Sequence, residues 1–259
     1  MTGLIVSHNE GHLIGDRLRE LRFCEELVVI DVASTDDTAS VAGANGARVV
    51  PHPFTRIAEL VHPDVAHEPR NDLIVIPDPD EEIPPALAAQ LVGIPEAMAD
   101  DEGTVVVPRI YYFRGRPLRG TVWGGTGKKI LVVSRSRAEF IPAVHRGVRL
   151  RPGYRSREIP WDGENAMRHH WTSGYREFLE KHVRYIGIEG PARALTGEIT
   201  GYRALVRTPY RSFRECYFTR KGYLDGVHGL ALSVLYALYM TASNVQLIRE
   251  LRRRKSPSG

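Results

Sequence analysis

The feature that most constrains this chain is a set of short apolar runs that alternate with segments of helical periodicity. The runs lie at residues 4–6, 27–30, 47–50 and 73–76, and each is rich in β-branched residues. Runs of this length and content are typical of buried strands. Helices are expected over 37–45, over 85–92 and after the first run, where apolar residues recur at helical spacing at Leu13, Ile14, Leu18 and Leu21. This alternation predicts a parallel sheet with helices on both faces.

Polar residues follow three of these runs. They are Ser7, Asn9 and Glu10 after the first, Asp31 and Ser34 after the second, and Asp78 and Asp80 after the fourth. The carboxyl ends of parallel strands face a common crevice where ligands bind. Asp31 can accept hydrogen bonds from a uracil edge or a ribose. Asp78 and Asp80 suit Mg²⁺, which takes one or two protein carboxylates and completes its shell with phosphate and water. The alternative is a solvated acidic turn before a helix that begins at Pro84 and Pro85. Glu81 and Glu82 are expected to cap or orient the turn.

The motifs at residues 3–10 (GLIVSHNE), 26–31 (ELVVID) with 34–38 (STDDT), and 78–81 (DPDE) occur in order along the chain. Together they resemble the family-2 glycosyltransferases, in particular the branch related to bacterial lipopolysaccharide-core glucosyltransferases. The resemblance covers residues 3–150 and continues more weakly to about 250. It implies an α/β fold of GT-A type, with a Rossmann-like mixed sheet flanked by helices. It also implies inverting transfer of a hexosyl group from a nucleotide-sugar, with Mg²⁺ or Mn²⁺ assisting.

The resemblance also implies roles for single residues. Ser7, Asn9, Glu10 and Ser34 lie where the family contacts the nucleotide, and Asp31 lies where it holds the base. Asp78 and Asp80 match its pair of ribose and metal aspartates. A metal at Asp80 would neutralise the charge that grows on the leaving nucleoside diphosphate. The favoured donor is a UDP-sugar, and the implied acceptor is a glycan, a lipid-linked saccharide or a small molecule, as in cell-envelope polysaccharide biosynthesis.

Residues 104–150 are expected to form the acceptor half, with strands at 104–107, 109–113 and 130–133. The glycines near residue 125 do not have P-loop spacing. Trp123 can stack on a sugar ring or serve as a core aromatic. Lys128 or Lys129 can reach a diphosphate, or both can be surface lysines. His145 suits a third metal ligand, a diphosphate contact, or a packed loop.

The catalytic base is not given by the resemblance. Arg146 stands where the related family often has glutamate. An inverting transfer needs a carboxylate near the acceptor hydroxyl. Asp162 and Glu164 are the nearest candidates, and ordinary loop charge is the alternative for each. His170 can face the metal or be structural.

We expect a catalytic domain over residues 1–186, with a nucleotide-binding half at about 1–100 and an acceptor half at about 101–186. Ser173 is expected to cap a helix over 174–186, and a loop rich in Gly, Pro and Ala over 187–201 marks the boundary. The region 187–259 is expected to be helical, basic and hydrophobic. Its uncharged run 226–248 is long enough for a membrane span, but contains several polar residues. A helical pair over 203–255 that lies on the membrane surface fits better, and a packed helix or homodimer interface is the alternative.

Composition narrows the alternatives. The formal net charge is +4, mostly from arginine, and there is no basic low-complexity arm, so nucleic-acid binding is not indicated. Cys24 and Cys216 form no zinc or disulfide motif, which favours the cytosol. The C-terminal region would add peripheral contact at the inner face of the membrane. No signal peptide is expected. Two alternative functions stay open: a sugar nucleotidyltransferase and a non-catalytic nucleotide-sugar-binding protein.

Overall fold

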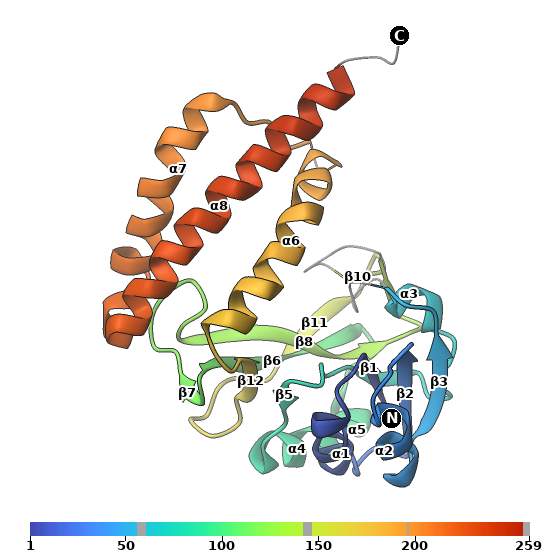
Figure 1. Cartoon of the computed structure of the whole chain (residues 1–259). Coiled ribbons are helices and arrows are strands. Elements are labelled where there is room, and N and C mark those ends of the chain that lie inside the picture. Colours follow the sequence, from blue (N-terminus) through green and yellow to red (C-terminus); the bar gives the residue numbers. More distant parts are fainter. Residues whose placement is uncertain (56–60, 142–146, 196, 256–259) are drawn as a thin grey trace. The chain divides into compact units, whose positions relative to one another are not determined.

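The computed structural model describes residues 1–55, 61–141, 147–195 and 197–255 (Figure 1). The chain forms two compact units. Unit 1 consists of residues 1–110 and 126–169, and unit 2 consists of residues 111–125 and 170–259. These units differ from the domains expected from the sequence, whose boundary lies at residue 186. Residues 111–125 and 170–186 therefore belong with the C-terminal helices.

A mixed sheet forms the centre of unit 1. The described strands follow the order β3-β2-β1-β4-β8-β6-β12-β5. The parallel strands are β1 (Thr2–Ser7), β2 (Glu26–Val32), β3 (Arg48–His52) and β4 (Leu73–Val75). The strand β8 (Thr126–Ser134) runs antiparallel to both β4 and β6 (Glu102–Phe113). Shorter strands are β5 (Glu81–Glu82), β9 (Ala138–Phe140), β10 (Val148–Leu150), β11 (Arg155–Glu158) and β12 (Met167–Thr172).

The sheet of unit 1 is buried on both faces. Ile5 of β1 packs with Leu18 and Leu87 in one cluster, whereas its neighbours Leu4 and Val6 pack with Val65 in the other. Successive side chains of a strand point to opposite faces, so a continuous apolar run supplies both cores. The α/β fold class, with a mixed sheet flanked by helices and a helical C-terminal region, is confirmed.

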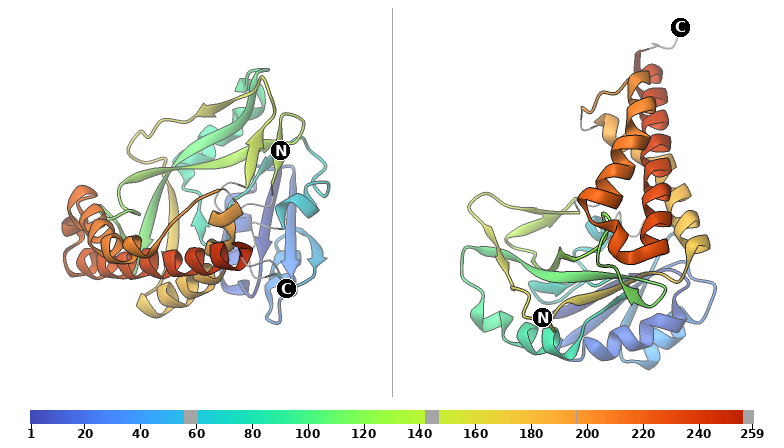
Figure 2. Two further views of the ribbon diagram at one scale, coloured as in Figure 1. Left: turned by 90° about the horizontal axis from the view of Figure 1, so that it is seen from above. Right: turned by 90° about the vertical axis from the view of Figure 1, so that its left-hand side faces the viewer.

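The helices of unit 1 are α1 (Gly11–Glu20), α2 (Thr38–Ala44), α3 (His62–Val65), α4 (Pro85–Val92) and α5 (Ile94–Ala97). In Figure 2, α1, α2 and α4 lie on one face of the sheet. The helix predicted over 85–92 is confirmed. In α2, Asp37 occupies the N-cap position and makes no side-chain capping hydrogen bond.

Two strand predictions merge into one. Residues 104–107 and 109–113 belong to the single strand β6, which runs through Pro108. The pairing of β6 with β8 shifts register between Val105 and Val106. Proline is tolerated in strands near such irregularities.

Unit 2 is mainly helical. Its elements are β7 (Arg116–Pro117), α6 (Tyr175–Leu195), α7 (Tyr202–Arg214), a π-helical turn η2 (Glu215–Thr219), a 3-10 turn η3 (Gly222–Asp225) and α8 (Gly226–Lys255). The loop predicted over 187–201 is wrong in its first part, since α6 continues to Leu195. Contacts between α6 and α8 outweigh the low helix propensity of Gly187 and Gly190.

The loop of residues 115–125 owes its glycines to close packing. A Cβ on Gly124 would lie 1.7 Å from the carbonyl oxygen of Gly120, and one on Gly120 would lie 2.0 Å from that of Lys221. The Asp225 carboxylate accepts the amide N–H groups of Arg119 and Gly120 at 2.9 and 2.7 Å. These glycines therefore serve backbone packing within unit 2.

Candidate functional site

Strand register in unit 1 brings the predicted polar residues to one edge of the sheet. Ser7, the last residue of β1, lies beside Asp31 of β2. The strand β4 pairs with β1 on its other side and leads into Asp78 and Asp80. Because the three strands are parallel, their carboxyl ends lie at one edge of the sheet, which is the edge where open α/β sheets bind ligands.

The loops after β1 and β2 are tied together by Asn9. Its amide N–H donates to Ser34 Oγ at 3.0 Å, and its Oδ1 accepts the amide N–H of Thr35 at 2.7 Å. Asn9 has a φ of 57°, in the left-handed region, where asparagine is better tolerated than most residues. Asn9 and Ser34, expected to contact the nucleotide, thus first of all shape the loops at the crevice.

Glu10 is a carboxyl group with a raised pKa at this edge. Its Oε2 accepts the Ser7 hydroxyl at 3.0 Å and the His8 amide at 3.3 Å. The pKa of Glu10 is raised to about 7, by burial first and then by the negative charges of Asp80 and Asp78, against the lowering effect of those hydrogen bonds. The ionisation of Glu10 therefore depends on the charges of Asp78 and Asp80, the two aspartates of the acidic turn.

The acidic turn, residues 78–81, packs against a buried lysine side chain. Lys129 Nζ is 2.8 Å from Asp78 Oδ2 and also contacts the Glu81 carboxylate. Glu81 is fully buried and accepts the Asp78 amide at 2.9 Å, which closes the turn. Burial raises the pKa of Asp78, but the Lys129 ammonium outweighs it and the net shift is downward. Burial also raises the pKa of Glu81, and the lowering effect of Lys129 is smaller, so the net shift of this pKa is upward.

Two further residues face the same carboxylates. His169 Nε2 lies 3.3 Å from Asp80 Oδ2, and its Nδ1 lies 3.5 Å from Glu81 Oε1. Arg109 of β6 lies 3.4 Å from Glu81. The turn thus holds three acids with three basic side chains from β6, β8 and β12.

Sequence reasoning missed His169 and considered His170 instead. In β12, Met167, His169 and Trp171 share one face of the strand, and Met167 and Trp171 are buried. His170 is exposed and packs on Tyr112 with 5.2 Å between ring centroids, within unit 2. The alternation of a strand was the signal that would have selected His169.

The side chains around Asp78 and Asp80 offer few ligands to a divalent cation. Among residues of the described ranges, no group of three His, Cys, Asp or Glu side chains could hold a metal ion. One oxygen of Asp78 is already engaged by Lys129. Asp80, with Asp78 beside it, still fits Mg²⁺ or Mn²⁺ carried by a diphosphate, because Mg²⁺ needs only one or two protein carboxylates. His145, the third predicted ligand, lies outside the described residues.

Asp162 serves as a loop cap. Its Oδ1 accepts the amides of Glu164 and Asn165 at 2.9 and 3.0 Å, and its Oδ2 accepts Gln90 at 2.9 Å. The Glu164 amide in particular holds the pKa of Asp162 below its usual value. Glu164 is exposed in the same loop.

The two neighbouring lysines lie on opposite faces of β8. Lys128 is exposed and pairs with Glu158 at 2.6 Å, whereas Lys129 turns toward Asp78. Of the two lysines considered for the diphosphate, Lys129 is the one in the acidic turn.

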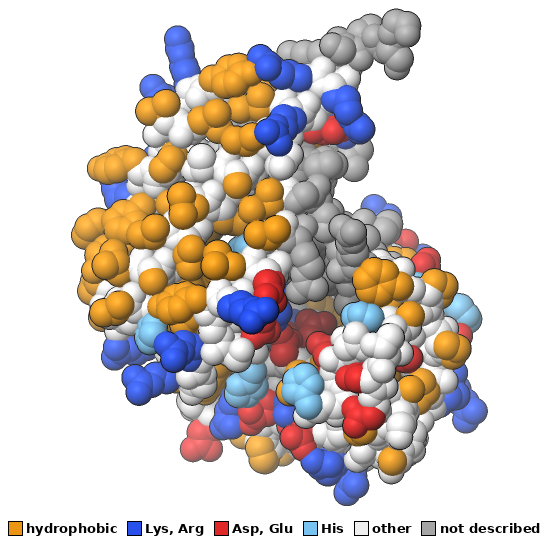
Figure 3. All heavy atoms as spheres, in the orientation of Figure 1, with side chains coloured by type: hydrophobic (Ala, Val, Ile, Leu, Met, Phe, Trp, Pro, Cys, Tyr) orange, Lys and Arg blue, Asp and Glu red, His pale blue; other side chains and the backbone are white. Residues whose placement is uncertain are grey.

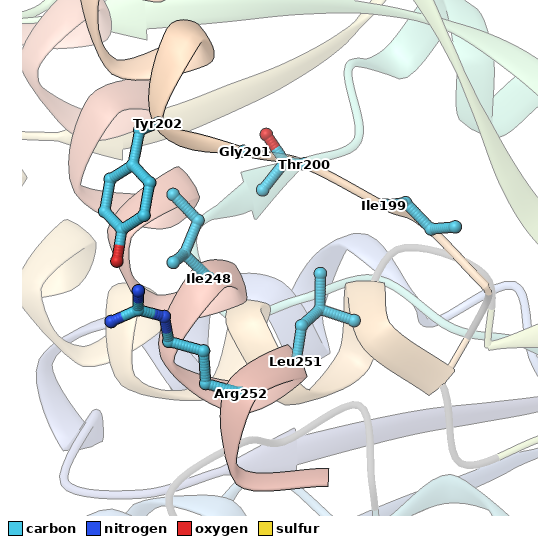
Figure 4. A pocket seen from close by; sticks show the side chains of 7 residues that line it. All are labelled: Ile199, Thr200, Gly201, Tyr202, Ile248, Leu251 and Arg252. Atoms are coloured by element: carbon cyan, nitrogen blue, oxygen red, sulfur yellow. The ribbon is translucent and has the colours of Figure 1, made fainter. Parts of the chain in front are cut away.

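Trp123 belongs to the aromatic core of unit 2. Its ring centroid lies 4.6 Å from that of Trp171 and 5.6 Å from that of Phe178. This is the core alternative that the sequence left open. Unit 2 also contains a pocket of about 280 Å³ between residues 199–202 and α8 (Figure 4). Ile248 and Leu251 line it, and Arg252 stacks on Tyr202 at 4.9 Å. No carboxylate lines this pocket, so it does not resemble a metal–diphosphate site.

No protein-family model matches the chain. Among solved structures, it is similar to a mycobacterial protein at 28% identity, covering 44% of this chain and 42% of that one, with a TM-score of 0.36. Glucosyl-3-phosphoglycerate synthase from Mycobacterium tuberculosis, in complex with Mn²⁺, UDP and glucosyl-3-phosphoglycerate, matches at 24% identity, 44% of each chain and a TM-score of 0.35. The same enzyme with Mn²⁺, UDP-glucose and phosphoglyceric acid matches at 20% identity, 52% of this chain and 56% of that one, with a TM-score of 0.38. The chain covers less than two thirds of the length of each, and its function is inferred from its own residues.

Proposed function

We propose that the chain is an inverting glycosyltransferase that moves a hexosyl group from a nucleoside diphosphate sugar to an acceptor hydroxyl. The observation that carries the proposal is the convergence of Ser7, Glu10, Asp31, Asp78 and Asp80 at the carboxyl ends of three adjacent strands. The GT-A type, family 2 and its lipopolysaccharide-core branch are proposed from the resemblance of the sequence motifs. The proposed acceptor is a saccharide or lipid-linked saccharide of the cell envelope.

The nucleotide is proposed to bind between the loops after β1 and β2. Asp31 of β2 lies at this edge, and its carboxylate Oδ1 accepts the Ser34 amide at 3.3 Å. That leaves lone pairs for N–H or O–H groups of a base or ribose. Because Asn9 ties the two loops together, the pocket is preorganised, which lowers the entropic cost of binding.

The diphosphate is proposed to lie at Asp78 and Asp80. Mg²⁺ or Mn²⁺ carried by the donor would be held by Asp80, with Asp78 beside it. When bound, such a metal neutralises charge that develops on the leaving nucleoside diphosphate. Lys129 holds Asp78 in its ionised form, and His169 orients Asp80 from the opposite strand. These residues therefore keep the turn in the state that binds a cation.

The acceptor hydroxyl must lose its proton to a carboxylate within hydrogen-bond reach. Asp162 and Glu164 are the carboxylates proposed for this step. The contacts of Asp162 favour Glu164, because two backbone amides and Gln90 already stabilise the ionised form of Asp162. A carboxylate stabilised in this way is a weaker base.

The decisive experiment compares nucleotide-sugar turnover by the wild-type chain, Asp80→Asn and Asp100→Asn. The wild type is incubated with UDP-glucose and other nucleotide-sugars, with and without Mn²⁺, and release of nucleoside diphosphate is followed. Asp80→Asn is expected to lose at least about a hundredfold in rate, as for the loss of one charge-stabilising group. Asp100 is a fully exposed acid of the same unit, so its variant is the matched control.

Three other outcomes would overturn the proposal. Full activity of Asp80→Asn would remove the assigned site. Pyrophosphate release from a nucleoside triphosphate and a sugar 1-phosphate would indicate a nucleotidyltransferase. Calorimetric binding of UDP-sugars with no turnover toward any saccharide acceptor or water would indicate a binding protein.

A further inference from the structure

Helix α8 buries polar side chains among apolar ones on its inner side and exposes a further set of apolar side chains on its outer side. Ser243 and Asn244 are buried, and Asn244 hydrogen-bonds Arg193 of α6 at 2.9 Å and Thr208 of α7 at 2.8 Å. The outward side chains are exposed by 80, 44, 44 and 61%; they are Val227, Leu230, Val234 and Leu238. Their spacing of three, four and four residues places them on one face of the helix. A helix packed only for a soluble core would carry polar side chains on this outer face.

The apolar face continues on α7 and the turn between the two helices. Tyr202, Val206 and Tyr210 follow at intervals of four residues on α7 and are 56, 81 and 70% exposed. Phe218 and Tyr223 extend the face at η2 and η3, and are 58 and 48% exposed. Figure 3 shows hydrophobic side chains gathered over α7 and the adjoining part of α8. Contiguous exposed patches of this kind mark binding surfaces.

A row of basic side chains borders the apolar face on α7. Its members recur every three or four residues and are all exposed; they are Arg203, Arg207, Arg211 and Arg214. None of the four forms an ion pair with a residue of the described ranges. The nearby acids are already engaged, because Glu215 pairs with Arg220 at 3.0 Å and Asp225 holds the amides of Arg119 and Gly120. The face therefore presents positive charge beside apolar and aromatic groups.

We propose that the face formed by α7, η2, η3 and the first half of α8 binds the surface of a bilayer that contains anionic lipids. Apolar side chains beside tyrosines and arginines are the composition of helices that lie in the headgroup region. Arginine side chains extend along the apolar boundary and keep their guanidinium groups at the phosphates. This inference goes beyond the proposed function and does not depend on it.

The same features disfavour two other occupants. A second copy of the chain would place one row of unpaired arginines against another in a symmetric interface. A membrane span is disfavoured because α8 packs on both α6 and α7 through buried polar contacts. By length and composition alone, Gly222–Arg254 is the one helical segment of the described residues that could cross a membrane. A window of 18 residues within it has a mean hydropathy of 1.3, and 39% of that window is buried.

The test is flotation of the purified full chain with phosphatidylcholine vesicles, with and without phosphatidylglycerol. The apolar face is altered in Val234→Gln/Leu238→Gln and the basic row in Arg207→Gln/Arg211→Gln. Val92→Gln on α4 is the apolar control, since Val92 is 55% exposed in unit 1. Arg176→Gln is the charge control, since the Arg176 side chain is 94% exposed on α6.

The wild type is expected to float with anionic vesicles, less with neutral ones, and less in high salt. Each basic residue at an anionic surface contributes about fivefold, so the double arginine variant is expected to lose about twenty-five-fold in partitioning. The double apolar variant is expected to lose at least about tenfold, and both control variants should bind like the wild type. The proposal is overturned if the wild type binds neither vesicle, or if either test variant binds like its control.

Two measurements identify the alternative occupants. Light scattering that shows a dimer broken by Val234→Gln/Leu238→Gln, without vesicle binding, would make the face a self-association surface and overturn the lipid proposal. Resistance of reconstituted protein to alkaline carbonate extraction would show a span and overturn it as well. Neither result would affect the assignment of the nucleotide-sugar site.

Discussion

Lys129 Nζ lies 2.8 Å from Asp78 Oδ2 and also contacts Glu81, so the acidic turn carries its own cation. The Lys129 side chain is only 13% exposed and Glu81 is fully buried. Burial lowers the pKa of Lys129, but Asp78 and Glu81 outweigh it and the net shift is upward. The charge of the turn is thus largely balanced before any ligand binds. A divalent cation that arrives with a diphosphate would then be held mainly by Asp80.

Replacing Lys129 with methionine is expected to destabilise the fold strongly. The substitution leaves Glu81 buried with its ammonium partner removed. Breaking a buried ion pair by removing one partner costs about 3–5 kcal/mol. Urea unfolding of Lys129→Met against the wild type measures this loss directly.

Lys128→Met is the matched control, because Lys128 is the adjacent lysine and its pair with Glu158 is exposed. It should cost less than about 1 kcal/mol. The double variant Glu81→Gln/Lys129→Met should be more stable than the sum of its single variants by at least about 1 kcal/mol, since both charges are then absent. Equal losses in Lys128→Met and Lys129→Met would show that the buried pair does not stabilise the turn.

Asn9 is expected to be sensitive to alanine for two separate reasons. Alanine removes the acceptor for the Thr35 amide and must adopt a φ of 57°. A lost hydrogen bond costs about 1 kcal/mol and the left-handed conformation roughly 1–2 kcal/mol, so Asn9→Ala should lose about 2–3 kcal/mol in urea unfolding.

Asn9→Gly tolerates the positive φ and is expected to lose about 1–2 kcal/mol, from the hydrogen bond and the greater freedom of the unfolded chain. The KM for the nucleotide-sugar should rise in both variants, because the loops that line the proposed donor site are no longer tied together. A glycine variant less stable than the alanine variant would contradict the conformational part of this explanation.

Much of unit 1 could be predicted from local sequence. The buried strands are β-branched apolar runs, and the polar residues that end them lie at one edge because β1 pairs in parallel with both β2 and β4. Lys129 and His169 were harder to assign, since each comes from a strand that joins the sheet from far along the chain. Which of two adjacent residues faces the acidic turn then depends on register. That choice is a tertiary property, although strand alternation around Met167 already favoured His169.

In the C-terminal region, local sequence was a poor guide to where a helix ends and to which of its faces is buried. Local composition predicted a break at 187–201, but α6 continues to Leu195 because it packs along α8. Similarly, the uncharged run of α8 could not reveal which of its faces is inward. Buried Asn244 and exposed Leu238 are set by contacts with α6 and α7, and not by the run itself.

Asp162→Asn and Glu164→Gln separate the two carboxylates proposed as the base. Loss of a general base lowers kcat by about 10²–10⁴-fold. Because the Asp162 carboxylate is occupied by loop amides and Gln90, Asp162→Asn is expected to change kcat by less than about threefold. Glu164→Gln is expected to show the full loss. The reverse order in steady-state turnover would assign the base to Asp162.

Glu10 predicts a pH dependence of stability that can be isolated in one variant. Its pKa is raised from 4.5 to about 7, by burial first and then by Asp80 and Asp78. The folded state therefore holds a proton that the unfolded state has released between about pH 4.5 and 7. The stability contributed by this group is full below about pH 4.5 and is lost as the pH rises through 7. At higher pH the ionised, buried carboxylate costs on the order of 3 kcal/mol.

Glu10→Gln removes the ionisable group while retaining a side chain of the same shape. Its unfolding free energy, measured in urea with a chelator present, is expected to exceed that of the wild type by about 2–3 kcal/mol near pH 8, and to match it near pH 4.5. Glu20, whose pKa is also raised to about 7, is present in both proteins and cancels in the difference. Glu96→Gln, at an exposed glutamate of α5, should leave both measurements unchanged. A Glu10→Gln protein that is less stable than the wild type near pH 8 would show that the Glu10 carboxylate is stabilised at the crevice and not penalised by its burial there.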